Sequence, residues 1–230
     1  MMTVAVLAGG LATRMHPITE KIPKALIDIA GIPFIVRQLG YLKKQGITKV
    51  VLCVGHLGEM IEDVIGSGVS LGIEVEYSYD GKELLGTGGA IKKALPILGK
   101  DFFVLYGDSF LPIDFLSVQN KFIKSNKLGL LTVLKNSNLW DKSNVNFNKG
   151  ILVEYNKRQI KPEMEFIDYG LSILSASVFE SYPKYFDLAD LYHDLSLSGQ
   201  LSGFEVYKRF YEIGSKDGLK EAEIYFLNNF

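Results

Sequence analysis

A glycine-rich segment with two cations follows the first apolar run of this chain. The run 4–8 has the character of a buried strand, and two glycines at 9–10 come directly after it. Thr13 then adds a hydroxyl, Arg14 a guanidinium and, further on, Lys24 an ammonium. Backbone N–H groups approach phosphate oxygens closely where a residue has no Cβ, and cations neutralise the phosphate charge. The segment therefore predicts a phosphate site, although it matches neither the P-loop nor the dinucleotide-binding pattern.

A carboxylate follows another apolar run. Gly107 and Asp108 come directly after the strand-like run 102–106. Mg²⁺ prefers one or two carboxylates together with substrate phosphates and water, so Asp108 is a candidate metal ligand. Aspartates in such positions also cap helices and turns, and the residues alone leave that alternative open.

A second glycine-rich stretch lies in the sequence YDGKELLGTGGAI at 79–91. Gly86, Thr87, Gly88 and Gly89 stand at the expected start of a helix. Backbone without side chains offers a surface against which a flat ring can lie closely. The alternative is a flexible loop that only begins the helix.

The first segment closely resembles the signature of the sugar-1-phosphate nucleotidyltransferases, also known as NDP-sugar pyrophosphorylases. The matching pattern is Gly-Gly-x-x-Thr-Arg-Met-x-Pro-Ile-Thr from residue 9, followed by Pro-Lys-Ala-Leu at 23–26. Ala12 stands where many relatives have glycine. The LGTGGAI form of the second stretch is most similar to members that act on heptose, mannose or muramic-type sugar phosphates.

The resemblance implies an activity, a cofactor and partners. The activity is transfer of a nucleotidyl group from an NTP to a sugar 1-phosphate. It gives an NDP-sugar and pyrophosphate, and it serves cell-surface polysaccharide synthesis. The cofactor is Mg²⁺ or Mn²⁺, and the partners are the NTP and the sugar 1-phosphate. The base and the sugar stay open, because relatives differ in both.

The resemblance also implies roles for individual residues. The residues expected to be catalytic are Arg14, Lys24 and Asp108. The residues expected to bind the nucleotide are Leu7, Ala8, Gly9, Gly10, Thr13, Arg14, Gly86, Thr87 and Asp108. The residues expected to bind the sugar phosphate are Lys24, Gly107, Lys157 and Asp168. The expected metal ligands are Asp108 and Glu212.

Some of these positions depart from the family or have a simpler explanation. Asn156 replaces the glutamate that precedes the family's lysine, so Lys157 is either a phosphate ligand or part of a charged turn. Asp168 either accepts hydrogen bonds from a sugar diol or pairs with a nearby cation. Glu212 stands where the family has aspartate, which is one methylene shorter. The alternative makes Ser215 a plain helix N-cap and leaves Glu212 facing solvent.

Strands and helices must alternate to position these residues. In the first half we expect strands at 4–8, 49–54, 73–79 and 102–106 and helices at 34–45, 58–65 and 89–98. In the more mixed second half we expect strands at 128–135, 145–147, 151–155, 170–174 and 204–206 and helices at 188–197 and 215–226. This rhythm predicts an α/β fold with a mostly parallel central sheet and helices on both faces.

With the resemblance, the expectation is one Rossmann-like nucleotidyltransferase domain over residues 1–230. Ligands in such folds bind at the carboxyl ends of the strands. The loop after residue 8 and the turn after residue 106 should therefore meet in one cleft.

Composition narrows the function and the compartment. A net charge of −1 gives no electrostatic reason to bind nucleic acid or a membrane surface. No apolar run reaches the roughly 18 residues of a membrane span, and the single cysteine, Cys53, forms no internal disulfide. We therefore expect a cytoplasmic protein, and a homo-oligomer is compatible with the sequence. Two other functions stay open: a cytidylyltransferase for a non-sugar phosphate, and a non-catalytic nucleotide-binding regulator.

Overall fold

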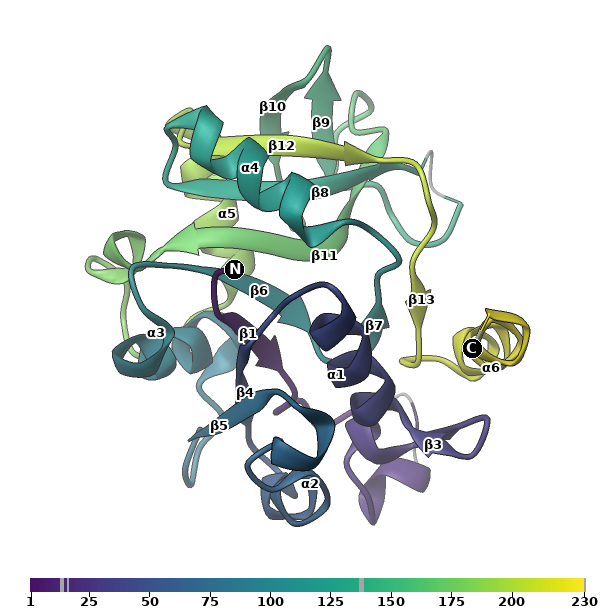
Figure 1. The fold of residues 1–230 in the computed structure, drawn as a ribbon. Helices are drawn as coiled ribbons and strands as arrows, with labels where there is room; N and C mark the ends of the chain where they lie inside the picture. Colours follow the sequence, from purple (N-terminus) through teal and green to yellow (C-terminus); the bar gives the residue numbers. More distant parts are fainter. Residues whose placement is uncertain (13–14, 16, 137–138, 230) are drawn as a thin grey trace.

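Parallel strands form one half of the central sheet (Figure 1). The structure is a computed structural model that describes residues 1–12, 15, 17–136 and 139–229. The strands of this half follow the spatial order β5-β4-β1-β6, and every neighbouring pair is parallel. Their bounds are β1 (Val4–Leu7), β4 (Lys49–Val54), β5 (Glu74–Tyr79) and β6 (Asp101–Tyr106). Helices cover both faces of this half, which explains why its central strands read as continuous apolar runs.

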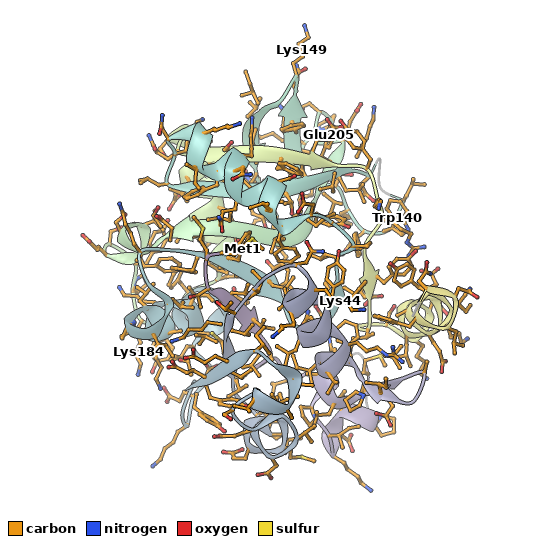
Figure 2. All side chains as sticks on the ribbon, viewed as in Figure 1. Met1, Lys44, Trp140, Lys149, Lys184 and Glu205 are labelled. Atoms are coloured by element: carbon orange, nitrogen blue, oxygen red, sulfur yellow. The ribbon has the colours of Figure 1, made fainter. Side chains whose placement is uncertain are left out.

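The other half of the sheet is mixed. Strand β11 (Phe166–Ser175) lies antiparallel to β6 and begins this half. It pairs in turn with β8 and β9, and the outer strands are β10 and β12. Their bounds are β8 (Gly129–Lys135), β9 (Val145–Asn148), β10 (Ile151–Tyr155) and β12 (Leu201–Val206). Lys149 lies at the tip of the β9–β10 hairpin, away from the body of the molecule (Figure 2). Lys149 and Gly150 both have positive φ, as the preferred two-residue hairpin turn requires.

The helices divide between the two faces of the sheet. Val4 and Val6 of β1 pack with α1, α2 and α4, whereas Ala5 between them packs with α3 and α5. This alternation follows from the opposite directions of successive strand side chains. The bounds are α1 (Phe34–Lys44), α2 (Gly58–Ile65), α3 (Gly86–Leu98), α4 (Phe115–Ser125) and α5 (Leu188–Leu197).

A third cluster of apolar side chains lies beside the sheet and holds the last helix, α6 (Lys216–Asn229). Phe226 of α6 packs there against Phe110, with ring centroids 4.7 Å apart. Two short antiparallel pairs lie at this side: β2 (Asp28–Ile29) with β3 (Ile32–Pro33), and β7 (Ser109–Phe110) with β13 (Tyr211–Glu212). The 3-10 helices are η2 (Ile18–Glu20), η3 (Lys24–Leu26), η4 (Val69–Leu71) and η5 (Ala176–Phe179).

The α/β fold with a mostly parallel centre is confirmed, and the expected elements are present within a few residues. The helix expected at 89–98 begins earlier, at Gly86, and the strands expected at 170–174 and 204–206 are longer. Helix α4 was not predicted, although Asp114 caps it and Phe115, Val118 and Phe122 form its buried stripe. In the described part of the chain, no helix is long and apolar enough to cross a membrane.

Candidate active site

A cavity of about 230 Å³ opens at the carboxyl ends of the central strands. It lies where the loop after β1 meets the turn after β6, as expected for a parallel sheet. The predicted site residues that line it are Leu7, Ala8, Gly9, Gly10, Lys24, Gly86, Thr87, Gly107 and Asp108. Of the other predicted residues in the described part, Lys157, Asp168 and Glu212 do not line this cavity. Thr13 and Arg14 lie outside the described residues.

Glycine is required where the loops at the strand ends touch. The Gly107 N–H donates to the Leu7 carbonyl at 3.0 Å, and a Cβ on Gly107 would lie 2.6 Å from that oxygen. A Cβ on Gly9 would likewise lie 2.9 Å from the Gly55 nitrogen. Gly10 differs, because a Cβ there would meet no described atom within 4 Å. The absence of a side chain at Gly10 therefore leaves backbone exposed to the cavity rather than making room for packing.

Ala12 has the left-handed backbone conformation, with φ of +50°. This conformation is unfavourable for a residue with a Cβ, which gives a physical reason for the glycine in relatives. The Ala12 carbonyl accepts hydrogen bonds from the Met15 N–H and from Thr19 Oγ1, both at 2.9 Å. These two bonds connect Ala12 to Met15 and Thr19 in spite of the strain at Ala12.

Lys24 and Asp108 form an ion pair at the rim of the cavity. Lys24 Nζ lies 2.9 Å from Asp108 Oδ2, and the two side chains are 18% and 37% exposed. Lys24 begins η3, whereas Asp108 follows β6, so the pair joins segments far apart in the sequence. The charged side chains that were predicted to hold substrate and metal thus meet directly.

Gln38 of α1 holds the turn that carries Asp108. The Gln38 side-chain amide donates to the Tyr106 carbonyl at 3.1 Å and to the Ser109 carbonyl at 2.8 Å. Both ends of the Gly107–Asp108 turn are therefore fixed by one buried side chain. The amide oxygen of Gln38 is buried and accepts no hydrogen bond from the described residues. Sequence reasoning missed Gln38, because a helical glutamine gives no local sign of such a role.

Glu212 is brought to the same place by strand pairing. Glu212 in β13 lies opposite Ser109 in β7, and the Ile213 N–H donates to the Asp108 carbonyl at 3.0 Å. The Glu212 carboxylate is half-buried and accepts hydrogen bonds from the Gly214 N–H and, at 2.5 Å, from Ser215 Oγ. The Ser215 hydroxyl also accepts from the Gly218 N–H at 3.0 Å, so Ser215 caps α6, and this part of the alternative is confirmed. The alternative of a Glu212 that faces solvent is wrong.

Gly214 marks the point where the charged groups converge. A Cβ on Gly214 would lie 2.8 Å from Glu212 Oε2, 3.3 Å from Lys24 Nζ and 3.4 Å from Asp108 Oδ2. One ammonium and two carboxylates therefore surround a single buried glycine. Among the described residues, no group of three or more His, Cys, Asp or Glu side chains could hold a metal ion.

Asp168 lies behind the cavity wall, at a shift of register in β11. Burial raises the pKa of Asp168 to about 6, opposed by hydrogen bonds from the Gly170 N–H and the Tyr106 side chain and by the Lys157 charge. The Gly170 bond is 2.9 Å long. Because Tyr106 lines the cavity, this tyrosine connects Asp168 to the cleft. Lys157 is exposed, and its contact with Asp168 is electrostatic.

The second glycine-rich stretch serves packing more than the sequence suggested. The Gly88 N–H donates to the Phe186 carbonyl at 3.0 Å, and a Cβ on Gly88 would lie 2.3 Å from the Phe186 ring. Thr87 Oγ1 donates to Asp187 Oδ1 at 2.9 Å and accepts from the Leu188 N–H at 2.9 Å. Of the glycines in LGTGGA, only Gly86 lines the cavity. Gly88 and Gly89 instead make room for residues 184–186.

Several cavity residues were not among the predicted site residues. They are Ala12, Ala25, Cys53, Asp80, Leu84, Ala90 and Tyr106. Asp80 had a usable signal, because it comes directly after strand β5, and Asp108 comes two residues after β6. Burial, together with the Asp80 charge, raises the pKa of the Cys53 thiol to about 12. Cys53 is therefore a protonated apolar part of the cavity wall.

Comparison with known proteins identifies the family. The nucleotidyl transferase family model matches residues 3–142. The chain is 35% identical over 182 residues to the D-glycero-alpha-D-manno-heptose 1-phosphate guanylyltransferase of Campylobacter jejuni, covering 79% of each chain. It is 42% identical over 115 residues to the N-acetylmuramate alpha-1-phosphate uridylyltransferase of Neisseria meningitidis, covering 50% of each.

The fold is also found in solved structures. The crystal structure of HddC from Yersinia pseudotuberculosis has a TM-score of 0.81 and 26% sequence identity to this chain. The match covers 98% of this chain and 100% of that one. The expected Rossmann-like nucleotidyltransferase fold is thereby confirmed. The family match and these likenesses show that the chain belongs to the nucleotidyl transferase family and is a nucleotidyltransferase.

Proposed function

We propose that this protein transfers a nucleotidyl group from an NTP to a sugar 1-phosphate, giving an NDP-sugar and pyrophosphate. The observation that carries the proposal is the convergence of Lys24, Asp108 and Glu212 around Gly214, at the edge of a glycine-lined cleft. A cation and two carboxylates beside exposed backbone suit a reaction between two phosphate groups. The relatives that act on heptose and muramate phosphates support a sugar phosphate as acceptor and a role in polysaccharide synthesis. The whole chain, 1–230, acts as one domain in this proposal.

The chemistry needs positioning more than proton transfer. An oxygen of the sugar 1-phosphate attacks the α-phosphorus of the NTP in line. The bond between that phosphorus and the bridging oxygen breaks, and pyrophosphate leaves with the electron pair. The attacking phosphate is already ionised at neutral pH, so no general base is required. The protein contributes alignment and charge neutralisation, which are large terms in catalysis.

Each polar group then has a role. The backbone at 9–10 and Arg14 hold the β- and γ-phosphates, and Thr13 supports the same loop. Lys24 lies between the α-phosphate and the incoming phosphate. Lys24 is paired with Asp108 in the structure, so its ammonium exchanges that carboxylate for phosphate oxygens when substrates bind. On the sugar side, Lys157 serves the phosphate and Asp168 the hydroxyls.

The residues fit a divalent cation. Asp108 and Glu212 are carboxylates that converge beside one glycine, and Mg²⁺ prefers one or two carboxylates with substrate phosphates. Each carboxylate oxygen has more than one lone pair, so the hydrogen bonds that Glu212 accepts leave acceptor capacity for a metal. When bound, Mg²⁺ or Mn²⁺ supplies positive charge that offsets the repulsion between the two phosphates.

A substrate matrix tests the proposal. Each NTP is mixed with each of a panel of sugar 1-phosphates, Mg²⁺ and the protein, and pyrophosphate release is measured. Phosphocholine and other non-sugar phosphates in the panel test the cytidylyltransferase alternative. We expect release with a sugar 1-phosphate, and a loss of about 10²-fold or more in Arg14→Ala and Asp108→Asn variants that remain folded. Nucleotide binding with no release across the matrix would instead identify a non-catalytic regulator.

A further inference from the structure

Asn144 joins three strands of the mixed half of the sheet. It directly precedes β9, and its N–H donates to the Phe166 carbonyl of β11 at 2.9 Å. Its carbonyl accepts from the N–H of Asn156, which directly follows β10, also at 2.9 Å. Its side-chain oxygen, Oδ1, accepts from the Asp168 N–H at 3.0 Å. Asn144 therefore connects the strand that carries Asp168 to the turn that follows β10.

The side chain of Asn144 takes the place of a strand partner for Asp168. In the described part of the chain, β9 pairs with β11 through one residue pair, Val145 with Phe166. Strand β11 continues from there to Asp168, where its register against β8 shifts before pairing resumes at Ser172. The Asp168 N–H lies beyond the pairing with β9, and Asn144 Oδ1 accepts its hydrogen bond as a backbone carbonyl would. The position of β11 at Asp168 therefore depends on this side chain.

A second asparagine shapes the turn after β10. Asn156 is buried, and its Oδ1 accepts from the Arg158 N–H at 3.1 Å and from the Gln159 N–H at 2.8 Å. Asparagine side chains commonly organise turns by such bonds to the following backbone. Lys157 lies inside this turn. Because the Asn156 N–H is bonded to Asn144, the backbone of Lys157 is held relative to Asn144 as well.

The two charged residues that Asn144 connects also act on each other. Lys157 is exposed, and its charge acts on the Asp168 carboxylate. Asp168 accepts a hydrogen bond from the side chain of Tyr106, which lines the cavity. If Lys157 binds the phosphate and Asp168 the hydroxyls of one sugar phosphate, their separation has to match the separation of those groups in the substrate. A displacement of about 1 Å in such an arrangement can cost about 10²-fold.

We propose that Asn144 is a positioning residue for the acceptor, and that it sets the separation of Lys157 and Asp168. This inference rests on the proposed function, in which those two residues bind the sugar 1-phosphate. Asn144 acts through them and needs no contact with the substrate. The backbone bonds of Asn144 do not depend on its side chain, so a substitution tests the bond from Oδ1 to the Asp168 N–H.

Steady-state kinetics test the role, with the NTP and the sugar 1-phosphate that release most pyrophosphate in the substrate matrix. Asn144→Ala should raise the KM for the sugar 1-phosphate by about 10-fold, because Asp168 is released from its position. The KM for the NTP should stay near the wild-type value, since the residues to which Asn144 is bonded do not line the cavity. Asn144→Gln is a second variant that keeps an uncharged amide. Its oxygen is displaced by about 1 Å, so the KM for the sugar 1-phosphate should rise here too.

Asn146→Ala is the matched control. Asn146 is a half-buried asparagine of β9, and its side chain has no hydrogen-bond partner in the part of the chain that the structure describes. This variant should keep the wild-type KM for both substrates. The effect of Asn144→Ala should also disappear in a Lys157→Ala, Asp168→Ala background, because changes that act through shared partners are not additive.

A wild-type KM for the sugar 1-phosphate in folded Asn144→Ala or Asn144→Gln protein would overturn the positioning role. An equal rise in the KM of both substrates would do the same, and so would an effect that persists in the Lys157→Ala, Asp168→Ala background, because each result indicates a general loosening of the fold. In these cases the wild-type protein still releases pyrophosphate, and the proposed function stands. Absence of release by the wild-type protein with every sugar 1-phosphate would overturn the proposed function and this inference together.

Discussion

Gly218 is a helical glycine whose replacement by alanine should damage the site. Ser215 caps α6, so Gly218 occupies the third helical position, and its φ is not in the left-handed region. At such a position alanine ordinarily stabilises a helix by about 0.5–1 kcal/mol. Here a Cβ would lie 1.9 Å from Glu212 Oε1, 2.5 Å from its Cδ and 2.7 Å from the Glu212 carbonyl oxygen. The Glu212 carboxylate therefore has to leave its place in Gly218→Ala.

The expected loss of stability follows from the hydrogen bonds that the Glu212 carboxylate loses when it is displaced. It loses the hydrogen bonds from the Gly214 N–H and Ser215 Oγ, and bonds to charged groups contribute about 1.5–3 kcal/mol each when well formed. Because Glu212 is half-buried, and because alanine returns part of the loss through helix propensity, we expect a net loss of about 1–3 kcal/mol. For a chain of this size that lowers Tm by roughly 2–12 °C. If Glu212 is a metal ligand, displacement by about 1 Å also slows turnover by about 10²-fold.

The assay is thermal unfolding together with pyrophosphate release at several Mn²⁺ concentrations. Gly40→Ala is the control, because Gly40 lies within α1, has no positive φ, and a Cβ there would meet no described atom within 4 Å. Gly40→Ala should follow the ordinary rule and gain stability. Gly218→Ala with wild-type Tm and wild-type turnover would refute the reasoning.

Replacing Glu212 by the shorter aspartate tests the same contact between Glu212 and Gly218. Glu212→Asp alone should slow turnover by about 10-fold or more, because the carboxylate falls short of its present position. In the Gly218→Ala background the shorter side chain removes the overlap with the carboxylate but not the one with the carbonyl. The double variant should therefore recover part of the lost stability, with a coupling of about 0.5–3 kcal/mol between the two sites. Strictly additive losses would show that the two residues do not share this space.

Three further changes have defined outcomes. Ala12→Gly should raise Tm by a few degrees, because the left-handed backbone costs alanine about 1–2 kcal/mol, and a lower Tm would contradict the strain at this position. Gln38→Leu should lower the free energy of unfolding by about 1–3 kcal/mol, because the Tyr106 and Ser109 carbonyls lose the hydrogen bonds that Gln38 donates. It should also raise the Mn²⁺ concentration needed for half-maximal activity, and an unchanged metal dependence would show that Gln38 does not support Asp108. Because the pKa of Asp168 is raised to about 6, the native state binds this proton more tightly than the unfolded chain does. The contribution of protonated Asp168 to stability is therefore fully present below about pH 4 and is lost as the pH rises through 6. Asp168→Asn should therefore gain Tm relative to wild type between pH 4 and pH 7, and a constant difference in Tm would contradict the shift.

The local part of the site could be predicted from the sequence because the fold makes strand ends meet. In a parallel sheet the carboxyl ends of neighbouring strands share one edge. The glycines after β1 and the Gly107–Asp108 turn after β6 therefore had to come together, and Gly107 lies against Leu7 as that rule requires. Lys24 belongs to a pattern of fixed spacing in the same segment, and it lines the cavity. These inferences needed only short-range signals and one rule of topology.

The rest depends on contacts between distant segments that leave no local trace. The pairing of β13 with β7 involves only two residues on each strand, which is too short for any alternation to appear. That pairing alone sets Glu212 beside Ser109. In the same way, Gly88 and Gly89 look like a surface for a base, but they accommodate residues 184–186, about a hundred positions away. A glycine in a sequence indicates that a Cβ does not fit at that position, and only the fold shows which atoms it would contact.

The charged residues of the candidate site hold one another in place. Asp108 is paired with Lys24, and Glu212 accepts hydrogen bonds from the start of α6, so neither carboxylate depends on a ligand for its present position. This arrangement avoids the cost of leaving charged groups unpaired in a partly buried place. In the function proposed above, substrates would bind by exchange, because phosphate oxygens would draw Lys24 away from Asp108 before that carboxylate serves a metal. Metal and nucleotide binding should for this reason strengthen one another. The nucleotide's phosphate would take Lys24 and leave the Asp108 carboxylate unpaired, and the metal would then neutralise that carboxylate.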